Sequence, residues 1–402
     1  MKYIVVVPDG MADYPIKELN NKTPLEYANT SNMDFIAQNG LIGFVNTIPK
    51  GLPAGSDVGN LSALGYDPRK IFSGRAPLEA ANLGIDLKED EIAFRCNLVT
   101  IENENMIDYS AGHITSEEAH TLISSLNEQI NIPGIKFYPG KSYRHLLVIK
   151  CRDPKTLSAI QCTPPHDILN KNIQSYLPAG IESQILLAVM EKAKKVLSDH
   201  HTNQVRIDLS QNPANNIWLW GQGTRPNLPL FKDKFGLTGS VISAVDLVNG
   251  IGKLAGLDVI SVPNVTGYYD TNFIGKAEYA LESLKIKDFV FIHIEAPDEA
   301  SHNGDLKMKI ESLERIDKEV IGTILNHFGS SDDFRILILP DHRTPVEKRT
   351  HTSEPVCFEM FGKGIPKENH TSFGEKKAEK SGLSFETGEK LMDYFIQRHL
   401  SA

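Results

Sequence analysis

The chain has 402 residues, of which 41% are hydrophobic and 23% are charged, and its net charge is −9 at pH 7. This length suits two or three domains, and the composition is that of an ordinary globular protein. The negative charge argues against a nucleic-acid-binding surface, although local arginines can still bind an anionic substrate. Four scattered cysteines without C-x-x-C spacing favour free thiols in a reducing compartment.

The first predicted element is a strand at residues 3–7 (YIVVV), which leads directly into Pro8 and Asp9. This apolar run is too short for the core of a signal peptide or for a membrane span. We therefore expect a cytoplasmic protein that has neither a membrane nor a nucleic acid as a partner. The sequence leaves its oligomeric state open.

The segment GLPAGSDVGNLSALGYDP (51–68) is typical of a turn followed by a helix. Ser56 follows Gly55 and is either a plain helix N-cap or a nucleophile, and the two roles can coexist. A serine hydroxyl is a weak nucleophile at neutral pH, so the second role requires a neighbouring base or a metal ion. The activating group must lie elsewhere in the chain.

The middle of the chain differs in character from its ends. Residues 96–180 contain short hairpin-like strands and one helix near 116–131, and a helix at 182–199 follows. We expect a smaller α+β domain at 96–180, inserted into a discontinuous main domain formed by 1–95 and 181–402.

The C-terminal half alternates between apolar runs and amphipathic runs. The expected strands lie at 216–220, 257–262, 288–294, 334–339 and 355–361, and the expected helices at 243–256, 273–284, 306–328 and 386–400. The polar segment 366–382 is expected to be a surface loop. Alternation of strands and helices predicts an α/β fold with a mostly parallel sheet flanked by helices.

Polar residues follow several of these strands, where ligands gather in open α/β sheets. Three aspartates and three histidines stand at such positions: Asp9, Asp298, His302, Asp341, His342 and His351. Each alone has an ordinary structural explanation, but six together at one sheet edge predict a metal site. Mixed carboxylate and imidazole ligands suit Mn²⁺ or Zn²⁺, and six ligands are enough for two ions.

A two-ion site would also give Ser56 an activator. One ion can bind the Ser56 oxygen and stabilise it as an alkoxide, and the start of the following helix favours an incoming phosphate. A pair of ions can then clamp both sides of a phosphoryl displacement.

Further signals lie in VVPDGMADYP, PAGSDVGNLSALGYDP, SGRAPLEAANLGI, FRCNLVTI, DYSAGHI, YRHLLVI, WLWGQG, PDEASHNGD, PDHRTPV and RTHTSEPV. Together these segments resemble the archaeal-type 2,3-bisphosphoglycerate-independent phosphoglycerate mutases, of the alkaline phosphatase superfamily, from residue 1 to about 400. The resemblance implies an alkaline-phosphatase-like fold with a substrate-binding lid. It also implies interconversion of 3-phosphoglycerate and 2-phosphoglycerate in glycolysis, without 2,3-bisphosphoglycerate. Two divalent ions would take part, Mn²⁺ first, with Zn²⁺, Co²⁺ or Mg²⁺ as alternatives.

The resemblance also implies roles for individual residues. Ser56 matches the phosphorylated serine. Asp298, His302 and His351 match one metal site, and Asp9, Asp341 and His342, with Ser56, match the other. The implied substrate binders are Arg75, Arg95, Asn97, Arg144 and Arg225, and the implied general acid is Asp108 or His113. The chain departs from the family pattern at Ala76 and Asn264, where glycine is expected.

Two enzymatic alternatives remain open at this point. A metal-dependent phosphatase would use the same core, and so would a family member that phosphorylates homoserine. A non-enzymatic protein on a degenerate phosphatase fold would have lost at least one ligand, whereas every expected ligand is present. The glycines of NGIGKLAG lie inside a helix pattern and not after a strand, which argues against a dinucleotide site.

Overall fold

The computed structural model describes residues 1–329, 331 and 333–397. These residues form two compact units. The core unit comprises residues 1–72 together with the described residues from 227 onward, and the inserted unit comprises Ser73–Pro226. The inserted unit is therefore wider at both ends than the expected 96–180.

The core unit contains an eight-stranded sheet within the described residues. In spatial order its strands are β13 (Ser384–Phe385), β2 (Leu41–Val45), β12 (Val356–Gly362), β11 (Phe334–Ile338), β1 (Lys2–Pro8), β10 (Phe289–Ile294), β8 (Gly239–Ile242) and β9 (Asp258–Val259). Strand β1 pairs in parallel with β10 and β11, whereas β12 runs antiparallel to both of its neighbours. The prediction of a mostly parallel α/β sheet is confirmed.

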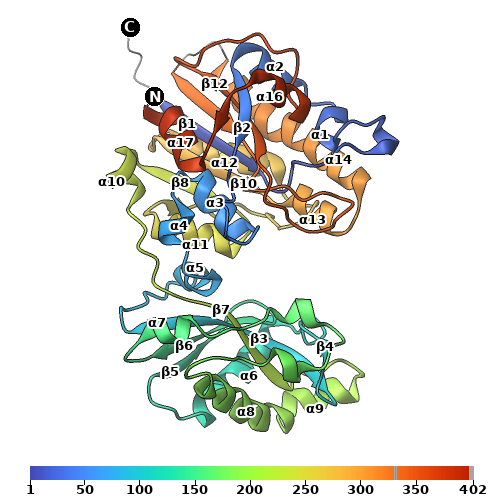
Figure 1. The fold of residues 1–402 in the computed structure, drawn as a ribbon, viewed down its shortest axis with the longest axis vertical. Helices are drawn as coiled ribbons and strands as arrows, with labels where there is room; N and C mark the ends of the chain where they lie inside the picture. The colour runs from blue at the N-terminus through green and yellow to red at the C-terminus, as the bar shows by residue number, and fades with distance from the viewer. Residues whose placement is uncertain (330, 332, 398–402) are drawn as a thin grey trace. The chain divides into compact units, whose positions relative to one another are not determined.

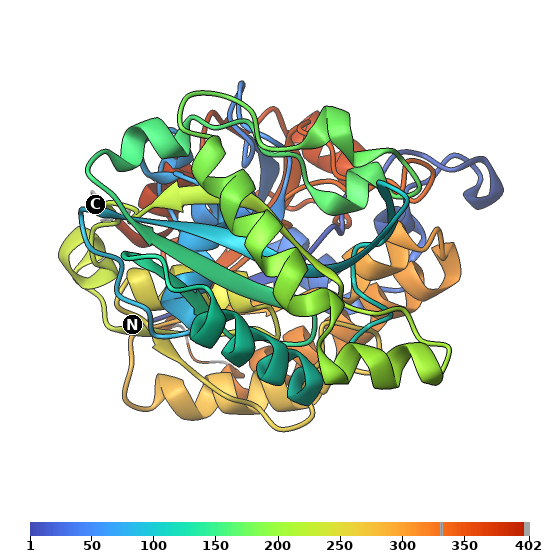
Figure 2. The ribbon, with the colours of Figure 1, turned by 90° about the horizontal axis from the view of Figure 1, so that it is seen from below.

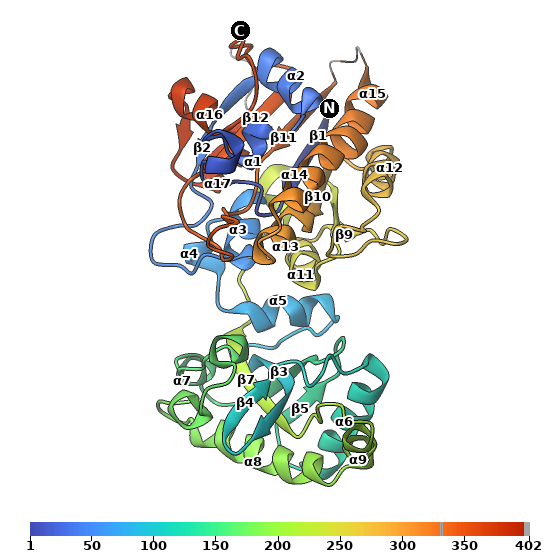
Figure 3. The ribbon, with the colours of Figure 1, turned by 90° about the vertical axis from the view of Figure 1, so that its right-hand side faces the viewer.

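Side chains alternate between the two faces of this sheet. Ile4 and Val6 of β1 point into a buried apolar cluster with α2 (Ser31–Asn39), α12 (Phe273–Leu284), α14 (Leu306–Arg315), η4 (Ile316–Ile321) and α15 (Gly322–Phe328). Helices α3 (Ser56–Ala63), α11 (Asp246–Leu254) and α17 (Gly388–Gln397) pack together as a second group. The sheet thus lies between helical layers, which Figure 1 and Figure 3 show for the core unit.

Some elements of the core unit differ from the expected ones. The expected strand 257–262 is only β9, and the expected loop 366–382 contains a helix, α16 (Glu375–Ser381). The expected helix 306–328 includes a π-helical stretch, η4, in which the Gly322 N–H donates to the Asp317 carbonyl. Residues 398–400 of the expected C-terminal helix lie outside the described residues.

The inserted unit is built on an antiparallel sheet. Its strands are β3 (Glu91–Glu102), β4 (Asn105–Asp108), β5 (Ile135–Tyr138), β6 (Arg144–Lys150) and β7 (Asn216–Thr224), and β3 pairs with β4, β6 and β7. Helices α6 (Ser116–Gln129) and α8 (Gln184–Ser198) pack on one face, which is seen in Figure 2. The opposite face packs against α5 (Arg75–Asn82). Because α5 and β7 complete this sheet and its core, the boundaries fall outside 96–180.

Shorter elements complete the chain. They are η1 (Lys17–Leu19), α1 (Pro24–Tyr27), α4 (Pro68–Ile71), α7 (Pro154–Ser158), η2 (Pro165–Ile168), η3 (Ile173–Tyr176), α9 (His201–Asp208), α10 (Phe231–Phe235) and α13 (Ala296–His302). None of the helices in the described residues is long and apolar enough to cross a membrane. The expected cytoplasmic location stays a prediction.

Candidate active site

The candidate site lies at the carboxyl ends of three neighbouring parallel strands of the core unit. Asp9 follows β1, helix α13 follows β10, and Asp341 and His342 follow β11. Since parallel strands end at the same edge of a sheet, these loops meet there. The structure brings together all seven residues that the sequence assigned to the two metal sites.

Gly10 allows the loop after β1 to approach Asp298 and Thr344 closely. Its φ is +63°, and a Cβ at this position would lie 2.7 Å from both Asp298 Oδ1 and Thr344 Oγ1. Glycine is therefore required by the backbone conformation and by the close approach of the two loops.

Asp298, His302 and His351 form one half of the site. Asp298 and His302 lie four residues apart on α13, and Asp298 Oδ2 is 3.2 Å from His302 Nε2. His351 Nε2 is 2.9 Å from His302 Nε2 and 3.5 Å from Asp298 Oδ1. One helical turn and one loop thus aim an oxygen and two nitrogens at a common point.

Asp9, Asp341, His342 and Ser56 form the other half. His342 Nε2 lies 3.5 Å from Asp9 Oδ1, 3.5 Å from Asp341 Oδ2 and 3.2 Å from Ser56 Oγ. Asn60, one turn after Ser56, donates to Asp341 Oδ2 at 2.8 Å and to the Ser56 carbonyl at 2.9 Å. This asparagine ties the nucleophile helix to the metal-ligand loop.

The donor groups are spaced for cation binding. Three sets each offer ligand atoms within 4.8 Å of one another: Asp298, His342 and His351; Asp9, His293 and Asp341; and Asp9, Glu295 and Asp298. Asp9 is only 1% exposed, and its two carboxylate oxygens have no hydrogen-bond partner in the described part of the chain. A buried carboxylate without donors fits a divalent cation, because such a charge is otherwise costly to bury.

The shifted pKa values of the cluster also fit cation binding. Burial and the neighbouring Asp341 and Asp298 raise the pKa of Asp9 well above its usual range. Burial also acts to raise the pKa of Asp298, but hydrogen bonds from His302 and His351 outweigh it and hold that pKa well below normal. The pKa of His302 rises to about 9, chiefly through its hydrogen bond to Asp298. The cluster has an excess of negative charge that cations would balance.

Two residues of the site were not predicted from the sequence. His293 lies inside β10, fully buried, with its Nε2 3.1 Å from Asp9 Oδ2, and Glu295 lies just after the strand. Burial lowers the pKa of His293 to about 4 and raises that of Glu295 to about 8. The available signal in the sequence was a polar residue, His293, within the apolar run DFVFIHI.

Ser56 is the first residue of α3, and Gly55 occupies the N-cap position. The alternative of a plain N-cap serine is therefore wrong. The Ser56 side chain points instead to His342, at the helix end where backbone N–H groups favour an anion.

The inserted unit gathers three of the predicted substrate binders. Arg95 forms an ion pair with Glu79 at 3.1 Å and stacks 4.2 Å from the centre of the Trp220 ring. Burial, and to a lesser extent the charges of Arg75 and Arg144, lower the pKa of Arg95 to about 10. The Arg75 Nε is buried without a hydrogen-bond partner among the described residues. Such a cluster of guanidinium groups suits a carboxylate or phosphate.

Aromatic residues connect this cluster to the remaining candidates. Asn97 accepts a hydrogen bond from Trp220 Nε1 at 3.1 Å. The rings of Tyr143 and His113 lie 6.4 Å apart, and Arg144 lies 5.6 Å from the Tyr143 ring centre. Trp220 and Tyr143 lie within the segments that carry the resemblance, but sequence reasoning gave neither of them a role.

Asp108 and Arg225 have other partners. Asp108 accepts hydrogen bonds from the Ser110 N–H and hydroxyl, the Gly112 N–H and Asn212, all between 2.7 and 2.9 Å. Burial acts to raise its pKa, but these bonds lower it overall, so Asp108 suits loop structuring better than proton donation. Arg225 is exposed and forms an ion pair with Asp86 at 2.9 Å.

The two departures from the family pattern fit the backbone. Asn264 has a φ of +58°, a left-handed conformation that asparagine tolerates better than most residues. Ala76 is buried in the first turn of α5, directly after Arg75.

Comparisons with known proteins show which family the chain belongs to. A family model described as 2,3-bisphosphoglycerate-independent phosphoglycerate mutase matches residues 37–203. A Methanosarcina barkeri protein of that name is 49% identical over 99% of this chain and 100% of its own length. A solved Pyrococcus horikoshii structure is 33% identical with a TM-score of 0.85, covering 98% of this chain and 96% of that one.

The cofactor-independent phosphoglycerate mutase of Thermoplasma acidophilum is 25% identical, has a TM-score of 0.68 and covers 99% of both chains. With a curated relative at almost half identity over its full length, the chain belongs to the 2,3-bisphosphoglycerate-independent phosphoglycerate mutase family.

Proposed function

We propose that this enzyme interconverts 3-phosphoglycerate and 2-phosphoglycerate through a phosphoserine at Ser56. The observation that carries the proposal is the position of the Ser56 hydroxyl. It lies at the first turn of α3, 3.2 Å from His342, beside a buried Asp9 whose oxygens lack hydrogen-bond donors in the described residues. The names of the full-length relatives support the choice of substrate.

The ligand set fits two divalent cations, Mn²⁺ first. Asp298, His302 and His351 would hold one, and Asp9, Asp341 and His342 with Ser56 would hold the other; the pairwise distances of 2.9 to 3.5 Å within each group support this division. Such ions supply charge neutralisation at the phosphoryl group and a lower pKa for the serine hydroxyl.

The chain itself positions and transfers the phosphoryl group. The N-terminal amides of α3 bind the phosphate, and Ser56 Oγ, having lost its proton, attacks phosphorus in line with the departing glycerate oxygen. That oxygen takes up a proton as the P–O bond to glycerate breaks. The second glycerate hydroxyl then attacks the phosphoserine, gives up its proton and restores Ser56.

Arginines of the inserted unit are the candidates for binding the anionic groups of the substrate. They are Arg75, Arg95 and Arg144, and the effect of Arg75 and Arg144 on the pKa of Arg95 supports their proximity. His113 is the better candidate for the general acid, since Asp108 is occupied by loop hydrogen bonds. His113 also has a left-handed φ of +50°, a strained conformation that is often found at functional sites.

The test is ³¹P NMR of Mn²⁺-loaded enzyme with 3-phosphoglycerate. We expect 2-phosphoglycerate to form with little free phosphate, and Ser56→Ala to lower turnover by several orders of magnitude because the covalent step is lost. Exhaustive chelation should have the same effect on the wild type. An active Ser56→Ala enzyme would contradict the mechanism.

Two other outcomes would redirect the proposal. Stoichiometric release of phosphate would make the enzyme a metal-dependent phosphatase. Indifference to phosphoglycerate, combined with phosphorylation of homoserine in the presence of a phosphoryl donor, would keep the core chemistry and replace the substrate.

A further inference from the structure

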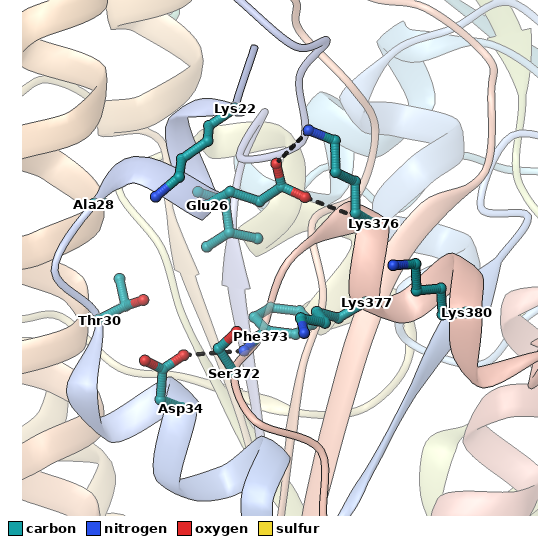
Figure 4. A pocket seen from close by; sticks show the side chains of 11 residues that line it. Lys22, Glu26, Ala28, Thr30, Asp34, Ser372, Phe373, Lys376, Lys377 and Lys380 are labelled. Atoms are coloured by element: carbon teal, nitrogen blue, oxygen red, sulfur yellow. Dashed lines mark hydrogen bonds and ion pairs between the residues drawn. The ribbon is translucent and has the colours of Figure 1, made fainter. Parts of the chain in front are cut away.

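A cavity of about 330 Å³ lies in the core unit and shares no residue with the metal-ligand cluster. It is bordered by α1, the start of α2, the loop before α16 and α16 itself, and it is open to solvent on one side (Figure 4). Its size falls within the range of small-molecule sites.

The cavity is lined by four lysines, Lys22, Lys376, Lys377 and Lys380. Lys376 forms an ion pair with Glu26 at 3.6 Å. The other three ammonium groups have no partner within the described part of the chain, and Figure 4 shows them without contacts. Lys377 and Lys380 lie three residues apart on α16, so they share a helix face.

The two acidic residues of the cavity are already engaged. Glu26 accepts the Lys376 N–H at 2.9 Å and the Thr23 N–H at 3.2 Å, and Asp34 accepts the Phe373 N–H at 3.0 Å. The lining thus carries four lysines against two carboxylates, Glu26 and Asp34, a net charge of +2 with all of them ionised (4 − 2). The field inside the cavity favours an anion.

The rest of the lining suits an organic ligand. Leu25 and Phe373 are buried and supply an apolar wall, and the hydroxyls of Thr30 and Ser372 add hydrogen-bonding capacity. We propose that this cavity binds a small organic polyanion, whose charged groups meet Lys22, Lys377 and Lys380 and whose carbon skeleton packs on Phe373.

Buried hydrogen bonds connect this cavity to the metal centre. Glu375, the first residue of α16, accepts the Thr23 hydroxyl at 2.6 Å and the Asp13 N–H at 3.2 Å. Asp13 in turn accepts Lys309 Nζ at 2.7 Å, and Lys309 also donates to the Thr344 carbonyl at 2.9 Å.

The Thr344 hydroxyl contacts both Asp298 and His342 Nδ1, so the chain of polar contacts ends on two metal ligands. A ligand that shifts α16 therefore acts on groups bonded to the centre. We infer that occupancy of the cavity affects turnover through these contacts.

The experiment uses Mn²⁺-loaded full-length enzyme and trimesate, a benzenetricarboxylate whose carboxylates are too far apart to chelate one ion. We expect saturable binding by calorimetry that weakens with salt. Lys377→Glu/Lys380→Glu should weaken binding about tenfold or more, because two charge-assisted contacts are lost. The control Lys192→Glu/Lys194→Glu on α8 makes the same charge change and should leave binding within about twofold of wild type.

A second measurement does not depend on the variants. Trimesate should slow the acetylation of Lys22, Lys377 and Lys380 in the wild type, read by mass spectrometry, and leave Lys192 and Lys194 unaffected. Absence of saturable binding, equal weakening by both lysine pairs, or protection elsewhere would overturn the site. Binding with unchanged kinetic constants would overturn the coupling.

Discussion

Asp9 is the residue that most clearly requires a partner from outside the chain. Its carboxylate is buried, faces two other carboxylates and lacks hydrogen-bond donors among the described residues. His293 Nε2 lies 3.1 Å from Asp9 Oδ2. Burial lowers the pKa of His293 to about 4, so this imidazole is neutral near pH 7. A neutral imidazole beside an unsatisfied carboxylate can bind or orient a metal ligand.

We therefore expect His293→Gln to lower metal affinity by about ten- to a hundredfold, the range known for outer ligands. Competition with a fluorescent chelator measures this directly. His145→Asn, which changes another buried histidine in the inserted unit, should leave the affinity unchanged. Equal affinities for wild type and His293→Gln would assign His293 to packing alone.

Arg144 is predicted to limit the hydrolysis of the phosphoserine by water. It is exposed beside Tyr143 and acts on the pKa of Arg95. If Arg144 holds the glycerate, Arg144→Ala should raise the ratio of free phosphate to 2-phosphoglycerate, because water then competes for the phosphoserine. Phosphate release measured during turnover checks this. Arg152→Ala, an exposed arginine of the same unit, is the control, and an equal ratio in both variants would contradict the assigned role.

Among individual residues, the ligands that follow strands were predictable from the sequence, because a polar residue after an apolar run stands out. The sequence did not predict His293 or Trp220, since both lie inside strands and look like core residues there. Their roles depend on which strands are neighbours, and that is a tertiary property.

Helix α3 illustrates how an element fixes the geometry of a residue. Its Gly59 faces the loop after β11, and a Cβ there would lie 2.5 Å from the Asp341 carbonyl oxygen. The glycine therefore sets how closely the Ser56 helix approaches Asp341 and His342. Asn60 then holds that approach with its bonds to Asp341 and to Ser56.

Gly59→Ala should lower kcat/KM by about a hundredfold, although alanine is the better helix former by about 1 kcal/mol. The clash of the new methyl group with the Asp341 carbonyl moves Ser56 away from His342. We therefore expect the loss of kcat/KM to come from the altered catalytic geometry and not from helix stability. Ala63→Gly weakens the same helix without that clash and should retain most of the activity. Activity that tracks helix propensity across the two variants would refute the steric explanation.

Local patterns predicted the long elements well and the irregular ones poorly. The run 366–382 is polar, yet its residues 375–381 form α16 because Ala378 packs into the core beneath it. The π-helical turn at Ile316–Ile321 leaves no trace in the hydrophobic period. It places Asp317 where its carboxylate accepts the N–H groups of Asn32 and Met33 in the first turn of α2.

For the whole molecule, the discontinuous organisation was foreseen but its boundaries were not. Strand-rich composition marks the middle of the inserted unit, whereas α5 and β7 look like the α/β elements around them. Only the pairing of β7 with β3 shows to which sheet it belongs. Sequence patterns report on elements, and domain limits depend on contacts between elements.

The stability of the inserted unit is expected to depend on pH through His145. His145 is buried, its Nδ1 accepts the Gly140 N–H, and burial with the nearby His120 lowers its pKa to about 3. In the unfolded chain the histidine pKa is about 6.5. As the pH falls, the unfolded state therefore binds a proton at His145 at a higher pH than the folded state does. The stability that neutral His145 contributes is complete above about pH 6.5 and declines toward about pH 3, by at most about 1.4 kcal/mol per pH unit.

The two tryptophans, Trp218 and Trp220, both lie in β7 and therefore report on this unit alone. Urea unfolding followed by their emission should lose more stability between about pH 7 and about pH 5 in the wild type than in His145→Asn. Parallel pH profiles for the two proteins would show that other groups determine the response.

The hydrogen bond between the Ser73 hydroxyl and the Thr224 carbonyl closes the inserted unit at its two ends. Everything this unit needs for its sheet is contiguous in the chain, whereas β1, among the first residues made, pairs with Phe289–Ile294 and Phe334–Ile338. On the ribosome, the inserted unit can finish folding while β1 still lacks both neighbours. The nucleophile and Asp9 are thus synthesised early but become an active site only after β11 emerges, so truncated products lack the complete ligand set.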